Sequence, residues 1–292
     1  MSPGGDHLLV FGLGYTGRAI ARAAVAAGLA VTATSRAPEL QSQPGVRVIH
    51  FNNAKAAIAA ATHILSTAAP DEQGDPVLAR YEPDIAAAAN LRWIGYLSTT
   101  GVYGDQGGAW VDEGTPPAPG SERTRRRVEA EQAWMVFPVA VDIFRLAGIY
   151  GPGRSMFDDL RTGQGRRVIK PGHLFGRIHR DDIARAVLAA MSRATPPGVS
   201  IFNLADDEPA ASADVVMEAA KLLGVPPPPA VAYEDALPKM SAMAKTFWAE
   251  NRKVSATKTK AALGISWKYP TYREGLRAIL AEERGEVATK QS

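Results

Sequence analysis

The stretch His7–Gly17, HLLVFGLGYTG, constrains the fold of this chain more than any other part of the sequence. Its apolar first half is followed by three glycines in the spacing Gly12-x-Gly14-x-x-Gly17, and an alanine-rich segment comes next, Arg18–Ala27. This order predicts a strand, a tight turn and a helix, the context in which such glycines bind a dinucleotide. A glycine-rich turn without a ligand is the alternative interpretation.

Each glycine has a separate expected role. Gly12 is expected to form the sharp turn, Gly14 to let the backbone approach a pyrophosphate, and Gly17 to let the helix pack closely on the strand. Tyr15 and Thr16 lie between these glycines, before a helix whose N-terminus offers free N–H groups and a partial positive charge to phosphates. We therefore predict that residues 12 and 14–17 bind a cofactor.

The residues that follow the second predicted strand, 30–34, bear on the choice of cofactor. Folds of this type that prefer NAD carry Asp or Glu about 20 residues beyond the glycine turn. Here Ser35 and Arg36 follow the strand, and no acidic residue precedes Pro38. Arg36 could meet a 2′-phosphate, although it could equally be an ordinary loop arginine. The sequence favours NADP, bound with the help of Ser35 and Arg36, and NAD remains open.

Strands and helices alternate through the first half of the chain. Further strands are predicted at 46–51, 63–66, 93–98 and 139–146, and helices at 54–61, 75–91 and 121–137, with Ser121 as an N-cap. This alternation predicts an α/β fold with a Rossmann-type, doubly wound parallel sheet. Ligands bind at the carboxyl edge of such a sheet. The small-residue turn of Thr67, Ala68 and Ala69 is therefore expected to contact the cofactor.

From about Arg154 the chain changes character, because glycines and prolines become frequent and the predicted strands become short. Helices are predicted at 180–193, 212–223, 254–263 and 272–283, and a strand at 200–204. We interpret residues 1–153 as the NAD(P)-binding domain and residues 154–292 as mostly a smaller α/β lobe that binds the substrate.

Composition excludes several classes of site and partner. The 292 residues are 46% hydrophobic and 22% charged, which is ordinary for a globular chain, and there is no cysteine for disulfides or thiolate chemistry. The net charge of +3 is too small to indicate nucleic-acid binding, and no apolar run is long enough to span a membrane. The five histidines lack H-x-x-x-H spacing, so no metal site is expected. The first residues, MSPGGDH, show no leader pattern, and a cytoplasmic protein with a small-molecule substrate is expected.

Six motifs occur in an order that resembles the extended short-chain dehydrogenase/reductase superfamily, and within it the NAD-dependent epimerase/dehydratase group. They are GLGYTG (12–17), STTGVYGD (98–105), FRLAGIYGPG (144–153), GRIHRDDIA (176–184), FNLADDEP (202–209) and LGISWKYPTYREGL (263–276). The resemblance implies a substrate that carries a hydroxyl or carbonyl, often a nucleotide sugar. It also implies that segments of the later chain, about 176–204, return to the first domain, and that His179 and Asp182 support the cofactor site.

The family's catalytic set is a Ser or Thr, a Tyr-x-x-x-Lys and an upstream Asn. Thr99 matches the first, with Thr100 as the fallback and a turn hydroxyl as the alternative. The register of Tyr-x-x-x-Lys gives Arg123 and Arg127. Arginine is always protonated and cannot act as the acid/base, but Arg127 could bind the nicotinamide ribose or a phosphate in place of lysine.

Asp84 stands at the position of the family's Asn, as in an atypical subgroup of the superfamily. It could carry the proton if burial raises its pKa, or it could simply pair with Arg80 on the same helix face. Two functions follow from these departures. The first is an oxidoreductase, epimerase or dehydratase whose catalytic residues are Thr99, Asp84 and Arg127, with the proton carried by Asp84, a histidine or water. The alternative is a non-catalytic NADP(H) sensor. The family often dimerises through helices equivalent to 75–91 and 121–137, so a homodimer is one expectation.

Overall fold

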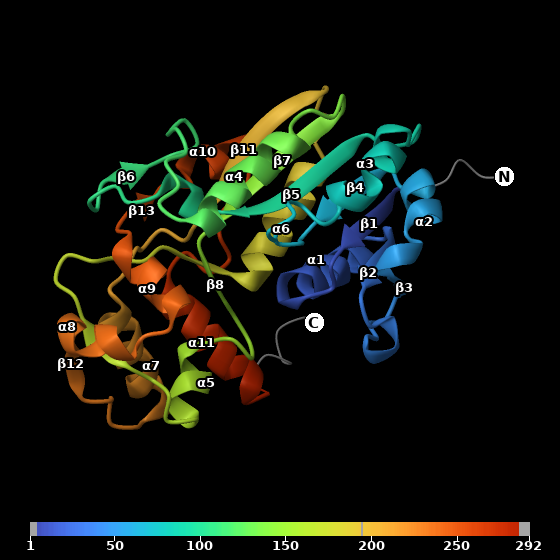
Figure 1. Ribbon diagram of the computed structural model, residues 1–292. Coiled ribbons are helices and arrows are strands. Elements are labelled where there is room, and N and C mark those ends of the chain that lie inside the picture. The colour runs from blue at the N-terminus through green and yellow to red at the C-terminus, as the bar shows by residue number, and fades with distance from the viewer. Residues whose placement is uncertain (1–4, 194, 286–292) are drawn as a thin grey trace.

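The chain is built around a seven-stranded sheet whose neighbouring strands are all parallel (Figure 1). The computed structural model describes residues 5–193 and 195–285, so the predicted lack of a leader at 1–4 falls outside them. The strand order is β11-β7-β5-β4-β1-β2-β3. The strands are β1 (His7–Phe11), β2 (Ala30–Ser35), β3 (Val46–His50), β4 (His63–Ser66), β5 (Trp93–Thr99), β7 (Ala140–Leu146) and β11 (Gly198–Leu204). The predicted α/β, Rossmann-type sheet is confirmed, and its strand order reverses between β1 and β4, where ligands bind in such folds.

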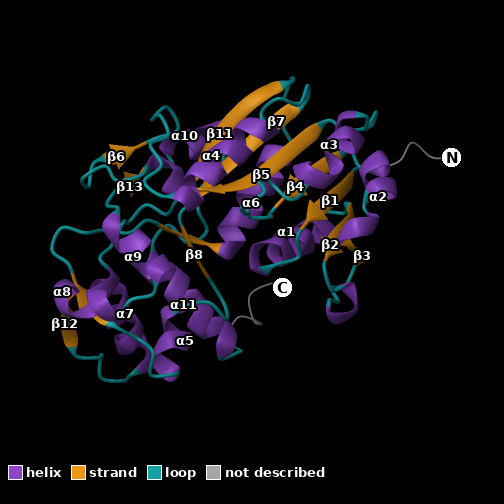
Figure 2. Cartoon of the chain, viewed as in Figure 1, coloured by secondary structure: helices purple, strands orange, loops and turns teal. Residues whose placement is uncertain are grey.

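Alternate residues of each strand supply two separate apolar cores. In β1, Leu8 and Val10 face one core while Leu9 and Phe11 face the other, as the period of two requires. Helices cover both faces of the sheet (Figure 2). The first face holds α1 (Tyr15–Ala26), α6 (Arg180–Met191) and α10 (Thr257–Leu263), and the second holds α2 (Lys55–Ala60), α3 (Leu78–Ala86) and α4 (Glu122–Trp134). Both faces are therefore buried, which explains why the strands are nearly continuous apolar runs.

A third core holds the smaller lobe together, below the sheet in Figure 1. Its members include Phe157, Val215, Tyr272 and Leu276. The helices of this lobe are α5 (Met156–Arg161), α7 (Ser212–Leu223), α8 (Tyr233–Ala236), α9 (Ala242–Ala249) and α11 (Tyr272–Glu283). Short parallel strand pairs connect its segments: β8 (Gly148–Tyr150) with β10 (Arg177–His179), and β9 (Arg167–Ile169) with β12 (Ala230–Ala232).

Two parts of the later chain join the sheet. Strand β11 forms its outer edge beside β7, and α6 packs on α1. The segment around α10 also returns, because Val254 and Leu263 belong to the same core as Leu8. This second return includes β13 (Lys253–Val254), which pairs with β6 (Trp110–Val111) in the long loop after β5.

Two predicted helices have different bounds. The helix predicted over 75–91 is only α3, because the carboxylate of Asp75 accepts the backbone N–H groups of Val77 and Leu78 and forms a turn before the helix. The helix predicted over 254–263 begins at Thr257, since Val254 is drawn into the strand pair with β6. Among the described residues, no helix combines the length and apolar character that crossing a membrane would require.

Candidate active site

The glycine turn after β1 is held by close backbone packing. Gly12 has φ +97°, a conformation that favours glycine, and a Cβ on Gly17 would lie 2.2 Å from the carbonyl oxygen of Gly12. The hydroxyl of Thr67 donates to the carbonyl of Phe11 at 3.1 Å and to that of Gly12 at 3.0 Å. Thr67, directly after β4, therefore fixes the turn at the reversal point of the sheet.

The N-terminus of α1 opens onto a cavity. Gly14 is the N-cap residue and no side chain caps the helix, while a Cβ on Gly14 would meet no atom within 4 Å. Gly14, Tyr15, Thr16 and Gly17 all line the cavity. An uncapped helix start leaves backbone N–H groups without partners, and phosphates bind at such positions. The cradle thus fits the pyrophosphate of a dinucleotide.

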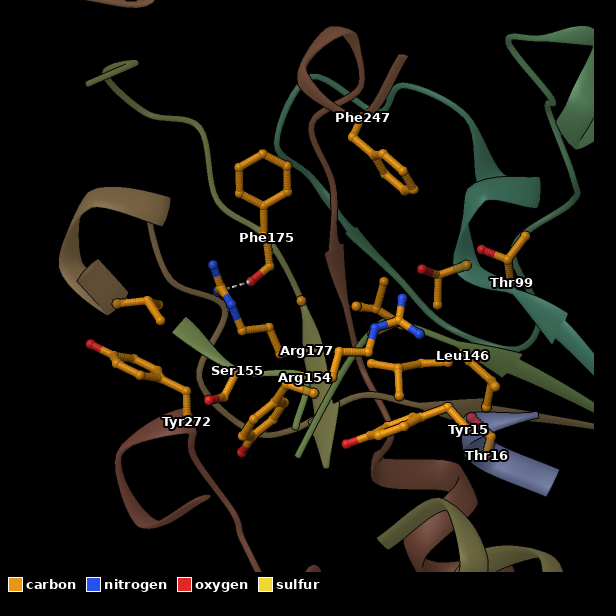
Figure 3. Close-up of a pocket in the computed structure, with 18 of the residues that line it drawn as sticks. Tyr15, Thr16, Thr99, Leu146, Arg154, Ser155, Phe175, Arg177, Phe247 and Tyr272 are labelled. Atoms are coloured by element: carbon orange, nitrogen blue, oxygen red, sulfur yellow. Dashed lines mark hydrogen bonds between the residues drawn. The ribbon is translucent and has the colours of Figure 1, made fainter. Parts of the chain in front are cut away.

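The cavity has a volume of about 840 Å³ and lies between the sheet and the smaller lobe. Its walls come from the start of α1, the end of β5, two arginines of α4, β8, and residues of β10, α9 and α11. Figure 3 shows Tyr15, Thr16 and Thr99 on one side and Phe175, Arg177 and Tyr272 on the other. The cofactor cradle and the lobe therefore face a common space.

Thr99 ends β5 and lines this cavity beside Thr100. Its Oγ1 accepts the backbone N–H of Gly101 at 3.1 Å, at the start of the short 3-10 helix η3 (Thr100–Tyr103). The hydroxyl therefore caps its own turn, as the alternative interpretation expects, and still has a proton that it could donate to a ligand.

Arg127 is anchored by three oxygens. Its Nη1 donates to the hydroxyl of Tyr96 at 2.9 Å, to the carbonyl of Leu97 at 3.0 Å and to that of Ala68 at 3.3 Å. It lines the cavity, and its Cζ lies 5.5 Å from the centre of the Tyr96 ring. The arginine thus connects the turn after β4 to β5, and it places a fixed positive charge on the same wall as Thr99.

Arg123, one helical turn before Arg127, also lines the cavity. Its Cζ lies 5.6 Å from the centre of the Phe247 ring. Desolvation, and then the charge of Arg127, lower the pKa of Arg123. Two cations therefore occupy the register of the family's tyrosine and lysine, and neither can exchange a proton near neutral pH.

Asp84 does not line the cavity. Its carboxylate lies 3.4 Å from Nζ of Lys55, so it joins α3 to α2 outside the cavity. Asp84 thus pairs with Lys55 and not with Arg80 as expected, and it lies outside the cavity in which a proton carrier would act. The guanidinium of Arg80 instead donates to the hydroxyl of Tyr81 at 3.3 Å. None of the described histidines lines the cavity either, and no cluster of described residues could hold a metal ion.

The residues predicted to select NADP lie beside the glycine turn rather than in the cavity wall. Thr34, at the end of β2, accepts the backbone N–H of Gly12 at 3.3 Å. Ser35 accepts the N–H of Ala37, and Arg36 is exposed with no ion pair to any described residue. Ala68 and Ala69 follow Thr67 at the neighbouring strand end; Ala68 gives its carbonyl to Arg127, and Ala69 is exposed.

The GRIHRDDIA segment has a structural role in the described chain. The ring of His179 caps α6 by accepting the N–H of Asp181, and burial lowers the pKa of His179 to about 4. The fully buried carboxylate of Asp182 accepts the backbone N–H groups of Lys268 and Tyr269 at 2.7 and 2.9 Å. Asp182 therefore ties the segment before α11 to the start of α6.

Sequence reasoning did not identify the lobe residues of the site. Arg154, Arg177, Phe247, Trp248 and Tyr272 all line the cavity, although they are far apart in the chain. No spacing signals them, because they come from loops and short elements that meet only in the folded lobe.

Comparison with known proteins agrees with this geometry. No protein-family model matches the chain. The Escherichia coli K12 protein YeeZ is 33% identical over 146 residues, which are 50% of this chain and 51% of YeeZ. A 3-diazoavenalumate denitrifying reductase from Streptomyces is 29% identical over 212 residues, covering 66% of each protein. The chain thus spans about half the length of the first curated relative and about two thirds of the reductase.

Solved structures extend the similarity to nearly the whole chain. A functionally unknown conserved protein from Silicibacter pomeroyi is 45% identical with a TM-score of 0.88, covering 96% of this chain and 99% of that one. A putative NAD-dependent epimerase/dehydratase from Methylobacillus flagellatus is 26% identical with a TM-score of 0.70 over the same shares. This chain has the fold of the NAD-dependent epimerase/dehydratase family. The predicted resemblance to extended short-chain dehydrogenases/reductases is confirmed.

More distant members of this fold carry nicotinamide dinucleotides. The human epimerase family protein SDR39U1, solved with NADPH, is 19% identical with a TM-score of 0.74, covering 94% of this chain and 98% of that one. MoeE5, solved with UDP-glucuronic acid and NAD, is 19% identical with a TM-score of 0.73, covering 97% and 100%. These two structures thus hold NADPH and NAD, respectively.

Proposed function

We propose that the protein is an NADP(H)-dependent oxidoreductase that acts on a carbonyl or hydroxyl group of a small molecule. The observation that carries this proposal is one cavity in which the uncapped start of α1 and the hydroxyl of Thr99 both take part. The helix start suits the phosphates of a dinucleotide, and the hydroxyl at the end of β5, two strands away from β1 in the sheet, suits a reacting oxygen beside the nicotinamide.

The chain's own residues divide the work of holding the cofactor. The N–H groups at the start of α1, beside Gly14, would bind the pyrophosphate, and Arg36 would meet a 2′-phosphate, which favours NADP over NAD. Arg127 would contact the nicotinamide ribose or a phosphate. When bound, the nicotinamide ring supplies or accepts a hydride. The exposed position of Arg36, free of ion pairs with described residues, suits a phosphate contact.

Thr99 would hold the reacting oxygen by donating its hydroxyl hydrogen. Arg127, fixed by three oxygens, adds positive charge to the same wall and would stabilise negative charge on that oxygen. With arginines in the register of the tyrosine and lysine, and Asp84 outside the lining, we assign the proton transfer to water. General acid/base groups contribute about 10²–10⁴-fold, so slow turnover is the expected result.

A second candidate function is supported by Arg123 and Arg127 themselves. Two permanent cations in place of the acid/base pair suit a protein that binds NADP(H) and reports its redox state without chemistry. Isotope exchange at nicotinamide C4, measured with candidate carbonyl compounds, separates the two functions. Any substrate-dependent exchange contradicts the sensor, and its absence across a broad panel contradicts the enzyme.

The cofactor assignment is tested by calorimetric titration with NADP, NADPH, NAD and NADH. We expect tight binding of NADPH and weaker binding of NADH, with the preference lost in Arg36→Ala. Arg47→Ala, on the neighbouring strand β3, is the matched control and should keep the preference. A preference for NADH in the wild type would overturn the role of Arg36, and no binding of any of the four would overturn both candidate functions.

A further inference from the structure

The cavity wall opposite Thr99 contains an arginine without an acidic partner. Nη1 of Arg177, on β10, donates to the carbonyls of Phe175 at 3.0 Å and Ala210 at 3.1 Å, which fixes the guanidinium in place (Figure 3). No carboxylate of the described residues lies within ion-pair distance of it, and Nε and Nη2 form no hydrogen bond with any of them. These two nitrogens remain as donors for a ligand in the cavity.

A second unsatisfied donor lies beside Arg177. Tyr272, at the start of α11, is 1% exposed and lines the cavity, yet its hydroxyl has no hydrogen-bond partner among the described residues. Cζ of Arg177 lies 6.0 Å from the centre of the Tyr272 ring. A buried hydroxyl without a partner is costly, which indicates a ligand group that accepts its proton.

Asp206 is the acidic residue with the largest electrostatic effect on Arg177, but the two side chains form no ion pair. Asp206 is 2% exposed, and neither of its carboxylate oxygens has a hydrogen-bond partner among the described residues. Burial raises the pKa of Asp206 well above its usual range, which favours the neutral carboxyl. The charge of Arg177 opposes this rise, yet no described carboxylate lies within ion-pair distance of Arg177, so its guanidinium can still bind an anionic ligand.

Aromatic side chains flank the same wall. Phe175 and Trp248 line the cavity with their ring centres 5.0 Å apart at 82°, and Cζ of Arg177 lies 6.0 Å from the centre of the Phe175 ring. Phe247 also lines it and is 45% exposed. Flat apolar surfaces of this kind pack well against a planar ring, edge-on or offset.

We propose that the substrate is an aromatic carboxylate, with its carboxylate on Arg177 and the hydroxyl of Tyr272 and its ring against Phe175 and Trp248. This proposal rests on the proposed function, because it places the reacting carbonyl or hydroxyl toward Thr99. One guanidinium and one hydroxyl match the two oxygens of a single carboxylate. The site therefore recognises a small aromatic acid rather than the nucleotide sugar that the family resemblance suggests.

The test compares two probes with the same ring and aldehyde, the anion 4-formylbenzoate and its neutral methyl ester. Calorimetry on the protein saturated with NADP should show at least tenfold tighter binding of the acid. Arg177→Gln should abolish this preference, and Tyr272→Phe, which removes only the hydroxyl, should reduce it several-fold. Arg185→Gln, an exposed arginine on α6, is the matched control and should leave the preference unchanged.

Several outcomes overturn the proposal. They are equal binding of acid and ester, a preference that survives in both Arg177→Gln and Tyr272→Phe, or binding of UDP-glucose in place of the acid. Cyclohexanecarboxylate that binds as well as benzoate would overturn the aromatic part. Repeating the titrations without NADP separates this proposal from the proposed function. If the protein binds the carboxylate but no nicotinamide cofactor, only the proposed function is refuted.

Discussion

Arg145 and Glu131 form a two-contact ion pair in the interior, with each side chain only 2% exposed. Nη2 of Arg145 lies 2.7 Å from Oε2 of Glu131, and Nε lies 3.1 Å from Oε1. The hydroxyl of Ser98 also donates to Glu131, so the pair joins α4 to β5 and β7 one residue before Thr99. Burial lowers the pKa of Arg145, but the bonds to Glu131 outweigh this and raise it. This pair therefore supports the strand end that carries Thr99.

Removing one charge of this pair should destabilise the protein strongly. Glu131→Gln leaves Arg145 buried and uncompensated, and we expect a loss of about 3–5 kcal/mol in the free energy of unfolding. The measurement is urea unfolding followed by circular dichroism. Glu129→Gln, an exposed neighbour on the same helix, should change stability by less than about 0.5 kcal/mol. Equal effects of the two substitutions would refute the importance of the buried pair.

The two glycines of the turn should respond differently to alanine. Gly17→Ala places a Cβ 2.2 Å from a backbone oxygen that cannot move freely, so we expect a loss of stability of about 1–3 kcal/mol or more. Gly14→Ala meets no atom within 4 Å and should leave the melting temperature nearly unchanged while it lowers NADPH affinity at least tenfold. Thermal unfolding and calorimetry read out the two effects, and intact NADPH binding in Gly14→Ala would contradict the pyrophosphate site.

Thr99 should matter for turnover and not for cofactor binding. We expect Thr99→Ala to lower turnover by about 10²–10³-fold, the range for loss of one donor to a developing oxyanion. Thr99→Ser keeps the hydroxyl and should retain most of the activity. NADPH affinity, measured in parallel, should be the same in all three proteins. If Thr99→Ala turns over as fast as the wild type, Thr99 serves only to cap η3.

The sequence was sufficient for features that depend on neighbouring residues. The positive φ of Gly12, the tight contact of Gly17 and the cap of Ser121 on α4 all follow from local backbone needs, and the structure contains each of them. The period-two pattern and the alternation of elements likewise led to the correct sheet. These features are readable because strands, turns and caps are decided within a few residues.

Features that depend on long-range packing were not readable. The expected role of Asp84 came from the family resemblance, whereas α3 packs on α2 and thereby brings Lys55 to Asp84. Arg177 and Tyr272 are 95 residues apart and meet only when α11 packs into the lobe. No local pattern predicts such a meeting, since each residue fulfils the ordinary needs of its own element.

His179 should make stability depend on pH in a defined window. Burial lowers its pKa in the folded protein to about 4, below the usual value near 6.5, so the unfolded chain binds more protons between these values. The contribution is fully present above about pH 6.5 and is lost as the pH falls toward 4. From pH 7.5 to 5 we expect His179 to account for about 2 kcal/mol of lost stability.

His179→Asn provides the comparison, because its amide oxygen can still accept the N–H of Asp181 and cap α6. Urea unfolding of both proteins at pH 7.5 and 5 gives the pH-dependent loss for each. Burial also lowers the pKa values of His63 and His173, but both are present in both proteins and cancel in the difference. The variant should lose about 2 kcal/mol less than the wild type. Equal losses would mean that His179 protonates in the folded state without cost, which its buried ring between Tyr150 and Tyr269 opposes.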